Sequence, residues 1–158
     1  MYKTLNIGGK DYKIEYTMEA ALCNECVESV TGLLMEMGIA SSEKDLKQIL
    51  KNMANLPHVT LTMFYAGLLE YHGDHPTGDR SIKTLSDAKA LIKQYMAENK
   101  DSDEGNFYGL MGILFEQMAE DGFFKQIGLE QMVNNAETES KAKKPQDHKK
   151  KAITTYAK

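Results

Sequence analysis

Near the start of this chain, apolar and polar residues alternate with a period of two, which is the pattern of β-strands with one buried face. The apolar positions of this pattern are Leu5, Ile7, Tyr12, Ile14 and Tyr16. Gly8-Gly9 lies between the two arms and can adopt the positive φ angles that a tight hairpin turn requires. The pattern predicts a β-hairpin over residues 3–16. Because an isolated two-stranded ribbon is only marginally stable in water, its apolar face should pack on the helices that follow.

From residue 17 onward, apolar residues recur every three or four positions, which is the period of an amphipathic helix. The pattern predicts helices over residues 17–38, 43–56, 57–72, 85–99, 106–121 and 123–135. Gly38 is the expected end of the first helix, and Pro57 is expected to separate the second from the third. Thr84, with Asp87 three residues later, is close to a capping box at the start of the fourth. The sequence therefore predicts a mainly α fold, with the hairpin packed on a bundle of about six helices and the 57–72 helix most buried.

The segment Asn106–Gly128 carries more apolar surface than one face of a helix can hide. As a helix, it would have polar residues along only one narrow stripe. A helix that is apolar most of the way round is buried on several sides, by its own domain or by a partner. Met111 and Met118 add flexible thioethers, which suit surfaces that accept varied helical partners. We therefore predict a partner-binding surface in this segment. Its residues are Phe107, Met111, Leu114, Phe115, Met118, Phe123 and Phe124.

Charge divides the chain into two parts. Residues 1–136 hold 12 of the 19 Lys and Arg and 20 of the 23 Asp and Glu, a net charge of −8, whereas residues 137–158 hold seven lysines against three acids, a net charge of +4. We predict a single helical domain over 1–136, followed by a disordered, lysine-rich tail over 137–158. The acidic body argues against nucleic-acid binding, because phosphate contacts need clustered Lys and Arg.

Two further features bear on location. The longest mostly apolar run, Leu61–Leu69, is about half the roughly 20 residues that a bilayer requires, and the first residues lack an apolar signal-peptide core. Two cysteines without a disulfide framework fit a reducing compartment. The sequence predicts a cytoplasmic protein with no membrane partner.

Candidate chemistry is sparse. Cys23 and Cys26 have the CxxC spacing, and His72 and His75 could complete a zinc site. However, both cysteines lie on the apolar stripe of the first helix, where small buried thiols are ordinary core residues, and about 45 residues separate the two pairs. Asp101–Gly105 resembles the start of a calcium loop, but its glycine comes at the fifth position rather than the sixth. No P-loop, dinucleotide fingerprint or nucleophile elbow is present, so we predict no enzyme activity, metal or cofactor.

Three stretches together resemble a known family. They are LNIGGKDYKIEYTMEA (5–20), LTMFYAGLLEYHG (61–73) and NFYGLMGILFEQMAEDGFFKQIG (106–128). In their pattern and order they resemble the tail assembly chaperones of long-tailed, siphovirus-type phages and prophages of Gram-positive bacteria. The resemblance spans most of residues 3–133. It rests on no catalytic signature and carries no fixed set of site residues.

The resemblance implies a small helical protein of the host cytoplasm that coats the tape measure protein, a long helical chain that aggregates when it is uncovered. Such a chaperone leaves as the tail tube polymerises and is absent from the mature virion. In many members a ribosomal frameshift also yields a longer product that recruits the major tail protein, and this chain would be the short form. The resemblance is also compatible with a homo-oligomer.

Two alternatives stay open at this stage. The chain could be a structural component of the virion, such as a head–tail connector or tail completion protein. It could also be a metal-dependent enzyme that uses Cys23, Cys26, His72 and His75. The lysines of the tail fit either an A-rich slippery gene sequence or a simple solubilising role.

Overall fold

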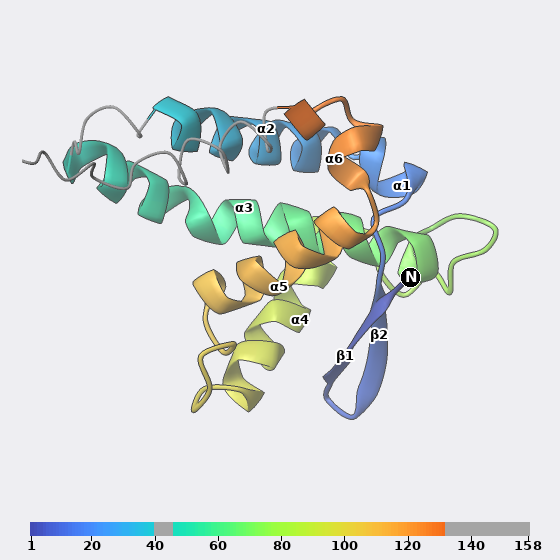
Figure 1. Cartoon of the computed structure of the whole chain (residues 1–158). Helices are drawn as coiled ribbons and strands as arrows, with labels where there is room; N and C mark the ends of the chain where they lie inside the picture. Colours follow the sequence, from blue (N-terminus) through green and yellow to red (C-terminus); the bar gives the residue numbers. More distant parts are fainter. Residues whose placement is uncertain (40–45, 132–158) are drawn as a thin grey trace, which may run out of the picture.

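The computed structural model of the chain describes residues 1–39 and 46–131 (Figure 1). Its elements are β1 (Lys3–Ile7), β2 (Lys10–Ile14), α1 (Met18–Ala21), α2 (Asn24–Ile39), α3 (Leu46–His72), α4 (Leu85–Glu98), α5 (Phe107–Glu120) and α6 (Phe123–Gln126). This arrangement confirms the predicted class, a mainly helical fold with an N-terminal two-stranded hairpin.

The hairpin forms as the alternation predicts. β1 and β2 pair antiparallel, with Leu5 opposite Tyr12, and Gly8 and Gly9 take φ values of 63° and 76° in the turn. The tip is held on α4, because the backbone N–H of Gly8 donates to both carboxylate oxygens of Glu98, at 3.0 and 3.1 Å. The apolar face of the ribbon therefore lies against helices. A two-stranded ribbon needs this support, because it is only marginally stable when isolated in water.

Helix α3 is the centre of the molecule. It packs against α1, α2, α4, α5 and β2, and Figure 1 shows it running through the middle of the bundle. Met63, Phe64 and Leu68 on its C-terminal half are fully buried. Among the residues whose burial the structure describes, the 57–72 region is the most buried stretch of helix, as predicted, and α3 packs against the apolar helix α5.

The end of β2 crosses α3 at very close range. The N–H of Glu15 donates to the carbonyl of Gly67 at 2.9 Å, and the hydroxyl of the fully buried Tyr16 donates to the carbonyl of Met63 at 2.9 Å. A Cβ atom on Gly67 would lie only 2.6 Å from Cγ2 of Ile14. The missing side chain at this position is what allows strand and helix to approach so closely.

The predicted helix boundary at Pro57 is wrong. The expected break at Pro57 does not occur, and α3 continues through it. Pro57 lacks the N–H that would bond to the carbonyl of Met53, but Met53 is 63% exposed, so water can reach this turn. Thr60 also supports the helix here, because its hydroxyl donates to the carbonyl of Leu56 at 2.8 Å. Packing of the long helix outweighs the local cost of the proline.

The predicted 17–38 helix is instead two helices. Thr17 caps α1 as expected, but the chain turns at Leu22 and Cys23 before α2 begins. The turn leaves Leu22 68% exposed and brings Ala20, Cys23 and Cys26 into the core. The three-residue apolar spacing is preserved across the turn, which is why periodicity alone does not reveal the break.

The end of the domain also differs from the prediction. The expected 123–135 helix stops at Gln126 as α6, and Gly128 takes a φ of 80°, which an α-helix does not continue through. Residues 132–135, the domain boundary at residue 136 and the predicted disordered tail lie outside the described residues.

Candidate functional site

The seven residues predicted to bind a partner divide into two groups. Leu114, Met118 and Phe123 are fully buried, and Phe124 is only 5% exposed. These four belong to the core of this chain, so a partner could reach them only if the fold opened. The sequence pattern predicts these four at a partner surface, whereas in this chain they are buried because α3 and α6 cover this side of α5.

The other three residues remain at the surface. Phe107, Met111 and Phe115 are partly buried, and Tyr108 beside them is 74% exposed. Tyr108, Met111 and Phe115 follow at i, i+3 and i+7 along α5 and form one apolar strip, which we call the α5 shoulder. The ring of Phe115 contacts that of Phe124 with a centroid distance of 4.8 Å.

A groove lies between the middle of α3, one side of α4 and the first residue of α5. We call it the α3–α4 groove, and its volume is about 220 Å³. It is lined by Pro57, His58, Leu61, Lys89, Ile92, Lys93, Met96 and Phe107. Small-molecule sites usually enclose about 300–1,000 Å³, so this groove better fits one or two side chains of a protein partner.

Local structure explains how each wall is placed. The capping box at Thr84 and Asp87, with both of its hydrogen bonds formed, fixes the start of α4. Asn106 caps α5 by accepting the N–H of Gly109 at 2.9 Å, which sets Phe107 at the groove edge. The hydroxyl of Thr60 reaches the carbonyl of Phe107 at 3.3 Å and ties the start of α5 to α3.

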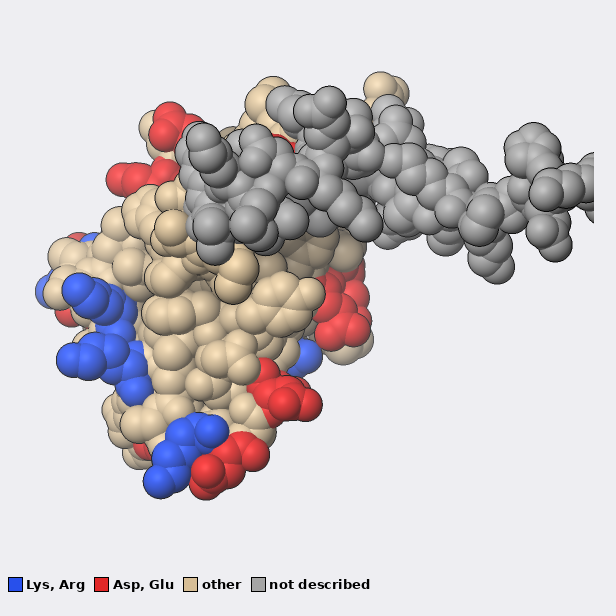
Figure 2. Space-filling model, turned by 90° about the vertical axis from the view of Figure 1, so that its left-hand side faces the viewer, with Lys and Arg blue, Asp and Glu red and all other residues tan. Residues whose placement is uncertain are grey.

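The floor of the groove is apolar and its rim is basic. Ile92 is almost fully buried, Leu61, Met96 and Phe107 are partly buried, and Lys89 and Lys93 are exposed. Figure 2 shows one face of the molecule, on which uncharged side chains fill the middle and charged side chains of both signs lie around them.

Of the groove residues, only Phe107 belongs to the surface predicted from the sequence. The others lie on α3 and α4, whose apolar stripes are narrower than that of the 106–128 segment. One pattern in the sequence does mark the edge of the groove. Lys89 and Lys93 have the i, i+4 spacing next to Ile92 and Met96, so two like charges share an edge with an apolar stripe.

His72 and Asp79 form an imidazole–carboxylate pair, with 2.9 Å between Nδ1 and Oδ2. Nε2 of His72 accepts the backbone N–H of Lys13 at 3.0 Å, so the neutral ring carries its proton on Nδ1 and donates it to Asp79. A catalytic imidazole needs a free nitrogen for substrate, whereas both nitrogens here are used. The pair is a structural link between β2 and the loop after α3.

Asp79 should make the free energy of unfolding depend on pH in the acidic range. Burial raises the pKa of its carboxyl, but hydrogen bonds from Ser81 and from the His72 ring outweigh it and hold the pKa well below the usual range. A carboxylate with a lowered folded-state pKa contributes stability above its ordinary pKa of about 3.9, and this contribution is lost as pH falls below that value. We expect Asp79→Asn to flatten this part of the pH dependence, measured by urea unfolding between about pH 6 and pH 3. An unchanged slope would contradict the assignment.

The four residues of the metal alternative do not form a site. Cys23 and Cys26 are buried, and burial raises the pKa of both thiols, which disfavours the thiolates that bind zinc. His72 is engaged as described, and Nε2 of His75 contacts the carbonyl of Leu69. Within residues 1–39 and 46–131, no group of three or more His, Cys, Asp or Glu side chains could hold a metal ion.

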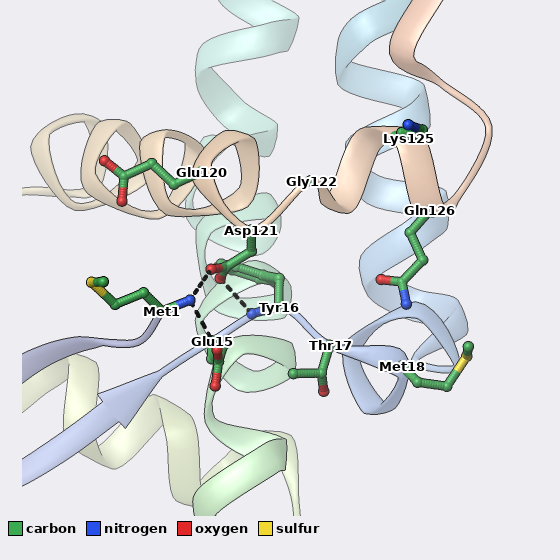
Figure 3. Close-up of a pocket in the computed structure, with 10 residues that line it drawn as sticks. All are labelled: Met1, Glu15, Tyr16, Thr17, Met18, Glu120, Asp121, Gly122, Lys125 and Gln126. Carbon is green, nitrogen blue, oxygen red and sulfur yellow. Dashed lines mark hydrogen bonds and ion pairs between the residues drawn. The ribbon is translucent and has the colours of Figure 1, made fainter.

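A larger depression of about 670 Å³ lies where the end of β2 meets the turn between α5 and α6 (Figure 3). Its deepest carboxylate, Asp121, accepts the N–H of Tyr16 at 2.8 Å and the side-chain amide of Gln117 at 2.9 Å. The amino group of Met1 lies 3.1 Å from Glu15 and 3.2 Å from Asp121. The carboxylates of Glu15 and Asp121 are thus used to join the start of the chain and the end of β2 to α5.

In the part of the chain that the structure describes, no helix is both long and apolar enough to cross a membrane. No protein-family model, no curated protein and no solved structure matches this chain.

Proposed function

We propose that this chain is a tail assembly chaperone of a long-tailed phage or prophage, and that it holds apolar helical segments of the tape measure protein. The observation that carries the proposal is the α3–α4 groove, which offers an apolar floor at the surface. An amphipathic helix can insert its apolar side chains into such a groove. The three sequence stretches that resemble this family point to the same client.

The size of the groove suits a chaperone that must release its client. Burial of one large apolar side chain contributes roughly 1.5–3 kcal/mol, and the cost of association offsets much of this gain. One or two anchors in the groove, together with contacts on the α5 shoulder, would give binding that tail-tube subunits can displace. The longer frameshift product of the family would use the same groove and bring the major tail protein through its added domain.

Met96 provides a direct test of the groove. In co-expression with the tape measure protein of the same phage, Met96→Glu should reduce co-purified client by about 10-fold or more, because a carboxylate would lie on the apolar floor. The neighbouring Ala97 is exposed and does not line the groove, so Ala97→Glu adds the same charge to α4 and should retain the client. Thermal unfolding of both variants separates lost binding from lost folding.

Two results would contradict the proposal. One is equal client recovery with Met96→Glu and Ala97→Glu when both are folded. The other is stoichiometric recovery of this chain by mass spectrometry of purified particles, which would instead identify a structural component of the virion.

A further inference from the structure

The rim of the α3–α4 groove carries two lysines without a counter-charge. Lys89 and Lys93 are exposed, lie one helical turn apart and form no ion pair with any described residue. Like charges at this spacing repel each other and weaken a helix slightly. His58 adds an imidazole to the same groove from α3.

The two acids at the ends of α4 form no ion pair with these lysines, and each is hydrogen-bonded to backbone N–H groups away from them. Asp87 accepts hydrogen bonds from the backbone N–H groups of Lys83 and Thr84 at the start of α4. Glu98 at the other end of α4 holds the hairpin tip through Gly8. Residues 1–136 carry a net charge of −8, so a basic rim on one apolar groove is a local exception on an acidic body.

We infer that the α3–α4 groove selects an amphipathic helix that carries Asp or Glu next to its apolar anchors. The inference rests on the proposed chaperone function and names the class of client segment. Carboxylates about one turn apart on such a helix would face Lys89 and Lys93 while its apolar side chains enter the groove. The chain's own residues 137–158 are a poor occupant, because their net charge of +4 has the same sign as the rim.

Two synthetic peptides of roughly 20 residues, long enough to form helices, test this selection. Both have the same leucines along one face, and these are flanked by glutamates in one peptide and by lysines in the other. The wild-type chain should bind the glutamate peptide about 10-fold more tightly at low salt. The difference should shrink toward 1 M salt, where the Debye length falls to about 3 Å.

The lysines are tested by reversing their charge. Lys89→Glu together with Lys93→Glu should abolish or invert the preference for the glutamate peptide. Lys100→Glu together with Lys125→Glu is the matched control, because both lysines are exposed, line no wall of the groove and give the same change in net charge. This control should keep the preference. Equal affinity of the wild-type chain for both peptides, or a preference that survives the Lys89/Lys93 reversal, would overturn the inference.

Failure of the charge selection and failure of the proposed function give different results. If Met96→Glu weakens both peptides equally while the lysine reversal changes nothing, the groove binds a client but charge selection is refuted. If the wild-type chain prefers the glutamate peptide but never retains the tape measure protein, the selection stands and the proposed function is refuted.

Discussion

Met118→Glu should unfold the protein. The side chain of Met118 is fully buried on α5, among core residues that include Leu114 and Phe123. An unpaired carboxylate in such surroundings loses its hydration and gains no partner, which costs several kcal/mol. The total stability of a domain is about 5–15 kcal/mol, so this single change removes a large part of it. We expect loss of the cooperative transition in thermal and urea unfolding followed by circular dichroism.

Ala119→Glu is the matched control for this experiment. Ala119 is the next residue on α5 and is exposed, so the same carboxylate remains in water and the free energy of unfolding should change by no more than about 0.5 kcal/mol. A folded Met118→Glu protein that fails to bind its client would instead mean that α5 opens and that the sequence-based interface was right. The experiment therefore decides between core and interface for the residues on which sequence and structure differ.

The fold was predictable where one local pattern decided the outcome. Alternation and the Gly8-Gly9 turn determine the hairpin, and Thr84 with Asp87 determines the start of α4. Prediction failed where tertiary packing overrode a local preference. Pro57 favours a helix end, but α3 continues through it into a stretch where Met63 and Phe64 are fully buried, and at the other break Leu22 is exposed while Cys23 and Cys26 are buried.

The candidate site was predictable only in part for a related reason. Apolar surface on α5 can be counted from the sequence, but which part of it another helix covers depends on how α3, α5 and α6 meet. A groove is made by residues distant in the chain, such as Leu61 and Met96, and no single helical stripe reveals it. Phe107 is the one groove residue predicted from the sequence, because it lies both on the apolar helix α5 and in the wall of the groove.

Gly67→Val should strongly destabilise the fold by forcing β2 away from α3. Its new Cβ would lie 2.6 Å from Cγ2 of Ile14 and 3.1 Å from the ring of Tyr16, and valine adds two methyl groups to that overlap. The backbone hydrogen bond from Glu15 to Gly67 prevents the strand from moving without a further loss. Overpacking of a core typically costs 1–3 kcal/mol, and we expect about 3 kcal/mol here, measured by urea unfolding.

Gly112→Val separates this steric effect from the helix preference of the residue. Gly112 lies on α5 with no heavy atom within 4 Å of an added Cβ, so valine meets open space there. Because valine is a slightly better helix former than glycine, we expect that variant to be equal to the wild-type chain or more stable by a few tenths of a kcal/mol. Equal stability of the two valine variants would mean that the strand does not cross α3 at contact distance. A large difference would establish Gly67 as the point where the hairpin docks, and hence as the residue that lets a marginal two-stranded ribbon cover the central helix.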